Sequence, residues 1–77
     1  MIRFLCKNPD SKVENCPAVF VDDETGDLLI QGWIETDPAT LATAAEHSPL
    51  AENEMIVRLP ASMRELILEK LGAEAVR

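Results

Sequence analysis

The sequence predicts an α+β fold: a small, mainly antiparallel sheet in the order β-β-β-α-β-α, with helices packed on one face. Three observations predict it. Residues 28–35 form an apolar, β-prone run between turn residues, and a helix start follows directly at residues 36–38. The strongest helix pattern lies at residues 61–71. The chain has 77 residues, so residues 1–77 are predicted to form a single domain.

The first predicted strand covers residues 2–7. Alternation places Ile2, Phe4 and Cys6 on one face and Arg3, Leu5 and Lys7 on the other. Two cations suit an edge strand, where charge discourages pairing with another sheet. Cys6 is in phase with apolar neighbours and is predicted to be a small core residue. Residues 8–17 contain turn residues and show little periodicity, which predicts a surface loop.

A hairpin is predicted from residue 18 to residue 35. Residues 18–22 form its first strand, and a short acidic loop ending at Gly26 fits a type I turn followed by a residue at positive φ. The second strand has a core face and a mixed face; the core face holds Leu28, Ile30, Gly32 and Ile34, and the mixed face holds Leu29, Gln31, Trp33 and Glu35. This pattern favours the middle of the sheet. Gly32 either makes room for a core side chain or marks a groove beside Trp33 that accepts a partner.

A short helix is predicted to follow. Asp37 can cap its free amides, Pro38 fits its first position, and Ser48-Pro49 ends it. Its apolar stripe consists of Leu41, Ala44 and Ala45. A fourth strand is predicted over residues 55–59.

The C-terminal helix is predicted over residues 61–71. Its buried stripe is Met63, Leu66, Ile67 and Leu71, with Leu68 outside it. Ser62 and Glu65 match a capping box, Pro60 at the first turn is an equal candidate for the helix start, and Gly72 is a natural helix end. Residues 73–77 are predicted to be a frayed tail.

The composition narrows the classes of function. With 14 acidic and 7 basic residues the net charge is −7, which repels phosphate backbones and favours either a basic partner surface or simple solubility. Two cysteines without a CxxC motif and one His make a poor zinc site, and we expect neither metal nor cofactor. Counting from Asp22, the twelfth residue is Trp33, so the acidic loop does not match an EF-hand. The sequence shows neither a signal peptide nor a membrane-length run, and we expect a cytoplasmic protein with reduced thiols.

Catalysis has little support in the sequence. There is one His, no GxSxG motif and no Gly-rich phosphate loop among three scattered glycines. The paired carboxylates fall in predicted turns and on exposed helix faces. We therefore expect a protein that is not an enzyme.

Residues 55–67 resemble the opening of ribbon-helix-helix DNA-binding proteins. In that family a short strand carrying an Arg runs through an Arg-Leu-Pro sequence, here Arg58-Leu59-Pro60, into an amphipathic helix. The strand pairs with its twin in a dimer and lies in the major groove. The resemblance implies that Ile56 and Arg58 are the outward, DNA-facing residues.

A broader set of motifs is similar to a group of small acidic actinobacterial proteins of unknown function. The motifs are Gln31-Gly32-Trp33, Thr36-Asp37-Pro38 and Val57-Arg58-Leu59-Pro60, followed by a terminal helix. Members of the group tend to be encoded near helix-turn-helix regulators. The resemblance implies an accessory role beside a transcription regulator and carries over no catalytic residue.

The sequence thus predicts an acidic protein-interaction module. The acidic loop, with Asp22, Asp23, Glu24 and Asp27, would meet a basic partner surface, while Leu29, Gln31 and Trp33 would supply an apolar anchor. A homodimer through the same face or through the edge of the first strand is equally compatible. DNA binding through Ile56 and Arg58 is the alternative.

Overall fold

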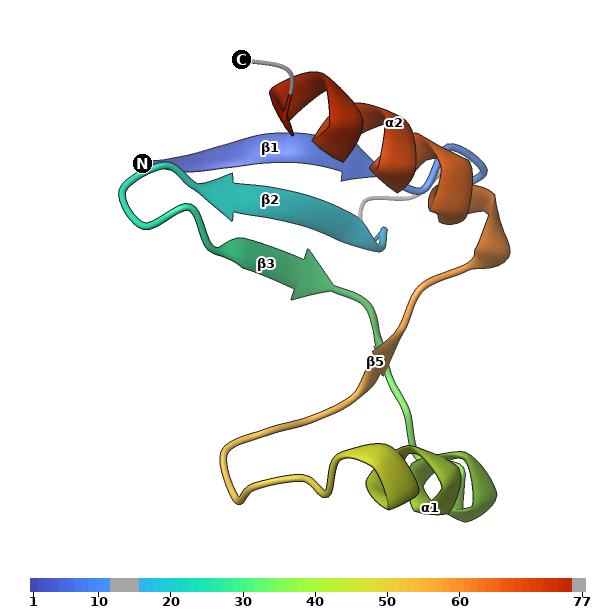
Figure 1. The fold of residues 1–77 in the computed structure, drawn as a ribbon. Helices are drawn as coiled ribbons and strands as arrows, with labels where there is room; N and C mark the ends of the chain where they lie inside the picture. The colour runs from blue at the N-terminus through green and yellow to red at the C-terminus, as the bar shows by residue number, and fades with distance from the viewer. Residues whose placement is uncertain (12–15, 76–77) are drawn as a thin grey trace.

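The computed structural model describes residues 1–11 and 16–75 and confirms the α+β class. Its elements are β1 (Ile2–Lys7), β2 (Ala18–Asp22), β3 (Leu28–Gln31), β4 (Trp33–Ile34), α1 (Pro38–His47), β5 (Val57–Arg58), the 3₁₀ turn η1 (Ala61–Met63) and α2 (Arg64–Ala75) (Figure 1). β1, β2 and β3 form one antiparallel sheet in that order, and β4 and β5 form a second one.

The core lies between the three-stranded sheet and α2. Val19 and Met63 are fully buried at its centre. The other buried members are Leu5, Cys6 and Val21, and Leu59, Leu66, Ile67 and Leu71 pack against them. The predicted buried stripe of the C-terminal helix is therefore confirmed, and so is the exposed position of Leu68. Cys6 is buried as predicted, and burial raises the pKa of its thiol.

β1 lies at one edge of the sheet, as its cations predict, but its alternation is broken. Phe4 pairs with Phe20, whereas Cys6 pairs with Val19, because a bulge inserts an extra residue between them. The inserted residue, Leu5, and the next residue, Cys6, are consequently both buried. Ile2 and Phe4 are exposed, so the prediction that they share a core face with Cys6 is wrong.

The predicted strand over residues 28–35 is two strands in two different sheets, separated at Gly32. A Cβ atom on Gly32 would lie 2.8 Å from the Arg58 carbonyl oxygen and 2.9 Å from Cδ2 of Leu59. Gly32 thus permits two chain segments to cross closely. It makes room for the Leu59 side chain, as the first of its two interpretations predicted, and also for the Arg58 backbone. β3 is an edge strand rather than a central one, and Leu28, Ile30 and Ile34, predicted for the core, are exposed.

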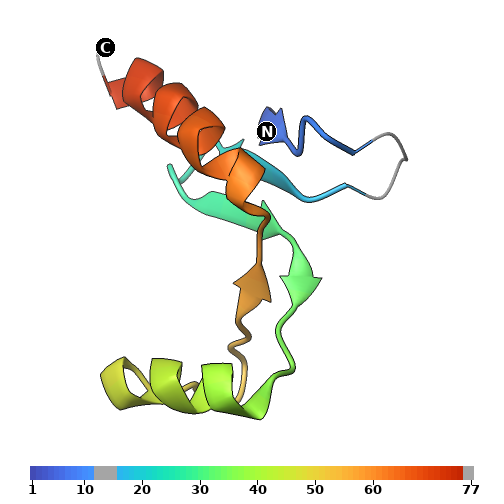
Figure 2. The ribbon, with the colours of Figure 1, turned by 90° about the vertical axis from the view of Figure 1, so that its right-hand side faces the viewer.

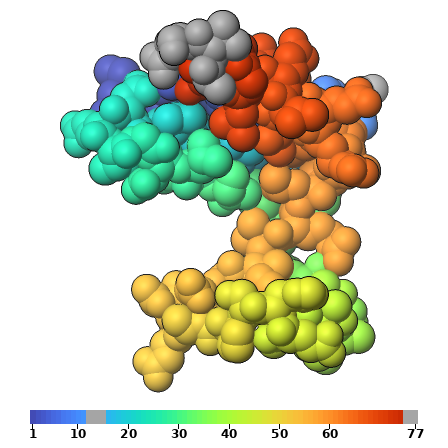
Figure 3. Space-filling view, viewed as in Figure 1, coloured from blue at the N-terminus to red at the C-terminus, as the bar shows by residue number. Residues whose placement is uncertain are grey.

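Beyond Gly32 the chain forms an extended arm, residues 33–60. The ribbon of β4 and β5 leads away from the three-stranded sheet, and α1 lies at its far end (Figures 1 and 2). Figure 3 shows a narrow connection between the two parts. α1 has the predicted start and end, but it contains no buried residue. The predicted strand over residues 55–59 is only Val57–Arg58, because β4 offers just two partner residues.

The C-terminal helix differs from its prediction at both ends. The Ser62 hydroxyl donates a hydrogen bond to Oδ1 of Asn8 (3.0 Å), so it ties the helix start to the loop after β1. α2 continues through Gly72 to Ala75 and includes part of the predicted tail. Residues 76–77, and residues 12–15 of the predicted surface loop, lie outside the described residues.

Asp37 is expected to make α1 sensitive to acid. The hydroxyl and the amide of Thr40 both donate to its carboxylate (2.8 and 3.1 Å) and lower its pKa below the usual 3.8. This stabilisation is therefore complete above the usual pKa and is lost as the pH falls through the lowered value. Replacing Asp37 with alanine should reduce the amide-exchange protection of α1 already at neutral pH, whereas Glu52→Ala should not. Equal protection in both variants would contradict the capping role.

Candidate interaction surface

Trp33 lies on the ribbon of the arm and is half exposed. Its exposed fraction is 51%, and that of Ile34 is 60%. Because neighbouring residues of a strand point to opposite faces, each face of the ribbon presents one large apolar side chain to solvent. Beside Trp33 is a shallow hollow of about 190 Å³, which is also lined by Cys16, Pro17, Gln31 and Gly32.

Leu29 belongs to the sheet face opposite α2. It pairs with Phe20, which pairs with Phe4, and directly paired residues share a face. The two phenylalanine rings make an edge-to-face contact with centroids 6.0 Å apart. Phe4 is 56% exposed and Leu29 40%, so this face is apolar but uncovered. We call Phe4, Phe20 and Leu29 the open face.

Gln31 ends β3 and is fixed at the base of the hollow. Its Nε2 donates to the carbonyl oxygen of Cys16 at 2.7 Å. Cys16 and Pro17 are themselves buried at the root of the loop after β1. The wall of the hollow next to Trp33 is therefore held in place by a hydrogen bond between distant parts of the chain.

The acidic loop forms the predicted hairpin turn. Gly26 has φ +81° and donates its amide to the Asp22 carbonyl (2.7 Å), which confirms the positive-φ position. The Asp22 carboxylate accepts from the amide of Glu24 (3.0 Å) and so stabilises the turn itself. Glu24 and Asp27 are exposed.

Arg3 joins the acidic turn to α2, which the sequence did not reveal. Its Nε donates to Asp23 (3.0 Å), and its two terminal nitrogens donate to the carboxylate of Glu74 (2.8 and 3.0 Å). The hydrogen bonds to Glu74 and then to Asp23 raise the pKa of Arg3. Glu74 falls in the predicted tail, and no local spacing relates it to Arg3. Asp23 thus has a partner at hydrogen-bond distance, whereas Glu24 lies 3.7 Å from the N-terminal ammonium and stays 82% exposed. Glu24 and Asp27 are therefore the more accessible acids.

A single chain does not bring the two halves of the predicted site together. The acidic turn precedes β3 and Trp33 follows it (Figure 1). Asp27 and Trp33 are six residue steps apart along largely extended chain, a separation of up to about 20 Å at roughly 3.3 Å per step. Leu29 and Gln31 lie between these two ends.

The two residues of the DNA-binding alternative lie on the arm. Arg58 pairs with Trp33 in the ribbon, and its Nε donates to Oε1 of Glu35 at 2.6 Å. The Asp37 amide and then Arg58 lower the pKa of Glu35, so the carboxylate stays ionised and holds Arg58. Ile56 is half-buried. Glu35 thus competes with a DNA phosphate for Arg58, and DNA binding stays a prediction.

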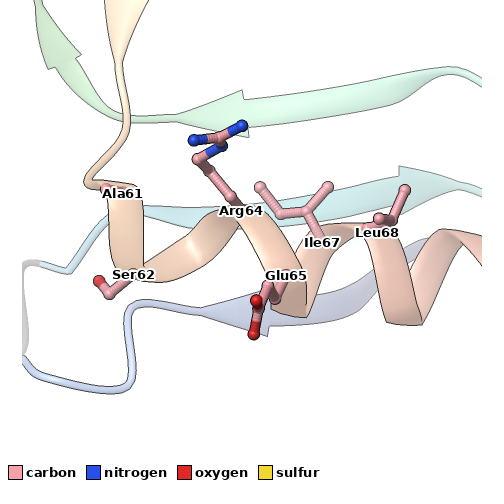
Figure 4. A pocket seen from close by; sticks show the side chains of 6 residues that line it. All are labelled: Ala61, Ser62, Arg64, Glu65, Ile67 and Leu68. Carbon is pink, nitrogen blue, oxygen red and sulfur yellow. The ribbon is translucent and has the colours of Figure 1, made fainter.

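A hollow along the start of α2 does not form an enclosed site. It measures about 670 Å³, and its lining is Ala61, Ser62, Arg64, Glu65, Ile67 and Leu68. In Figure 4 Arg64 and Ile67 project from one side of α2, while Ser62 and Glu65 project from the other. Because every lining residue comes from one continuous stretch, the hollow has no opposing wall.

Within residues 1–11 and 16–75, no cluster of three or more His, Cys, Asp or Glu residues is placed to hold a metal ion. Neither helix in this part of the chain has the length and apolar content needed to cross a bilayer. No protein-family model, curated protein or solved structure matches the chain.

Proposed function

We propose that this chain is a protein-interaction module that binds a partner with a basic surface and acts beside a transcription regulator. The observation that carries the proposal is the exposure of Trp33 on the arm, next to a hollow and to the exposed Ile34. An indole buries a large area when it binds, and a central aromatic side chain with polar neighbours is a frequent source of binding energy. Gln31 and the acidic turn supply the polar neighbours.

The exposed apolar side chains support the same conclusion. Two groups of exposed apolar side chains lie on β3 and on the arm that follows it: Leu28, Leu29 and Ile30 on β3, and Ile34, Leu50 and Met55 on the arm, all at least 40% exposed. Single exposed apolar residues are ordinary, but a series of them along one strand and the arm that continues it indicates a binding surface.

The charge of the chain supports a basic partner. The net charge is −7, and Glu24 and Asp27 project from the hairpin turn at one end of β3. Such a potential steers a positively charged surface toward the turn, and salt screens this attraction. The regulator-associated role rests on the resemblance to small acidic actinobacterial proteins.

The proposal is tested by capture of a partner from host lysate on the tagged chain, at low and at high salt, with identification by mass spectrometry. We expect a stoichiometric partner with a basic surface that dissociates at high salt. Trp33→Ala should abolish capture, whereas Leu68→Ala, which removes a 75% exposed apolar side chain from α2, should leave it unchanged. Equal capture by both variants would contradict the assignment of the anchor.

The contribution of the turn is tested by neutralising its accessible acids. Glu24→Gln with Asp27→Asn should weaken capture and reduce its dependence on salt. The matched control is Glu65→Gln with Glu69→Gln, which removes the same charge from exposed positions on α2. An equal loss in both double variants would show that net charge alone, and not the turn, attracts the partner.

A further inference from the structure

The two edges of the three-stranded sheet are protected differently. β1 carries Arg3 and Lys7, and charged side chains on an edge strand discourage pairing with another sheet. β3, at the other edge, is Leu-Leu-Ile-Gln and carries no charge, and all four of its residues are exposed. Figure 3 shows that this edge borders a recess between the sheet and α1.

The backbone of β3 is arranged to accept another strand. The Asp22 amide bonds to the Asp27 carbonyl (2.9 Å), which marks residues 22 and 27 as a hydrogen-bonded pair. Such pairs alternate along an antiparallel ladder, so Leu29 and Gln31 bond to β2. The amide and carbonyl groups of Leu28 and Ile30 therefore point away from β2, toward the uncharged edge.

The chain exposes more surface than a compact protein of its size. Its accessible surface is 6132 Å², whereas about 4,700 Å² is typical of a folded chain of this mass. Its radius of gyration is 14.0 Å, against about 11.5 Å for a compact domain of this length. The excess of about 1,500 Å² for one chain fits the area that each subunit buries in an obligate homodimer.

The arm contributes to this exposed surface. None of residues 33–60 is buried. Ordering a residue costs roughly 1–2 kcal/mol of conformational entropy, and a ten-residue helix such as α1 is marginal without packing. The arm therefore needs packing against another surface to offset this entropy. The exposed apolar residues of the sheet, including the open face, would also be stabilised by burial.

We propose that a second copy of this chain is the occupant: two copies pair antiparallel through their β3 edges and form one continuous six-stranded sheet, with each arm lying against the other copy. This inference rests on the proposed function and completes its site. Antiparallel pairing about the middle of β3 places the acidic turn of each copy beside Gln31 and Trp33 of the other. The acidic and apolar halves, up to about 20 Å apart in one chain, thereby meet twice in the dimer.

Charge and symmetry favour a second copy over an unrelated protein for this edge. Residues 28–34 carry no charge, so two chains of net charge −7 can pair there without placing carboxylates of one copy against carboxylates of the other. The acidic turns lie at the two ends of the paired strands. A two-fold axis also makes the interface self-complementary, because the arm and the uncovered sheet are present in every copy.

The test is light scattering coupled to size-exclusion chromatography on the purified chain at micromolar concentration. We expect about 17 kDa, twice the 8.5 kDa of one chain. Ile30→Lys should yield a monomer, because it places like charges across the join. Ile2→Lys is the matched control: it adds the same charge to a similarly exposed isoleucine on the other edge strand and should remain a dimer.

A monomeric wild type would overturn the inference, and this outcome does not depend on whether either variant folds. A dimer that persists in both variants, or is lost in both, would overturn the assignment to β3. These results are separable from the proposed function: a monomer that still captures a basic partner refutes only the dimer, and a dimer that captures nothing refutes only the partner.

Discussion

Replacing Met63 with alanine is expected to remove about 2–5 kcal/mol from the free energy of unfolding, the largest loss from any single truncation in the chain. Met63 is fully buried where η1 meets α2, in the cluster that contains Val19 and Cys6. Truncation leaves a cavity that the surrounding side chains fill only in part. A chain of 77 residues has a total stability of roughly 4–12 kcal/mol, so the variant should lose a large fraction of it.

Urea unfolding followed by circular dichroism measures this loss. Leu68→Ala is the matched control, since it truncates an apolar side chain on the same helix that is 75% exposed. Its effect should stay within about 0.5 kcal/mol, as for most surface substitutions. Similar losses at the two positions would show that α2 does not pack as described.

Gly32→Ala is expected to destabilise the fold by about 1–3 kcal/mol. The added methyl group would lie 2.8 Å from the Arg58 carbonyl oxygen, which is backbone and cannot rotate aside. The crossing of residue 32 with residues 58 and 59 would have to open, and this crossing joins the arm to the sheet. The loss should therefore appear both in urea unfolding and in the exchange protection of the β4–β5 ribbon.

Gly72→Ala provides the opposite expectation. Gly72 lies inside α2 with nothing within 4 Å of an added Cβ. Alanine there should stabilise the chain by about 0.5–1 kcal/mol, because glycine is the poorer helix former. A neutral or stabilising effect of Gly32→Ala would contradict the close contact of residue 32 with residues 58 and 59.

The sequence predicted correctly those elements that depend on residues close together in the chain. The hairpin turn at Gly26 follows from turn residues, and α1 follows from the Asp37-Pro38 start. The stripe around Met63 follows from helical periodicity. In each case the decisive interaction lies within a few residues of the pattern, so the sequence alone was sufficient.

The failures arise where a distant segment decides the outcome. The close approach of Arg58 and Leu59 at Gly32 divides one apolar run into strands of two sheets. The bulge after Phe4 changes which residues of β1 face α2. Alternation within a strand cannot reveal either feature, because each depends on which segment the strand pairs with.

The candidate site could be predicted only in part for the same reason. Composition and alternation indicated Trp33 and the acidic turn, and both are accessible in the fold. The sequence did not show that β3 separates them, or that Arg3 binds both Asp23 and Glu74. Exposure of the β3 edge became visible only when β2 proved to be the central strand.

The most direct test of the central claim, that the apolar surface along β3 and the arm is an interface, uses the fluorescence of Trp33, the chain's single tryptophan. The emission maximum is compared between the wild type and Ile30→Lys at equal micromolar concentration. We expect emission at shorter wavelength in the wild type, where the second copy lies beside Trp33, than in the variant, where the indole faces solvent alone. The same emission maximum in both proteins, with the variant folded, would contradict it.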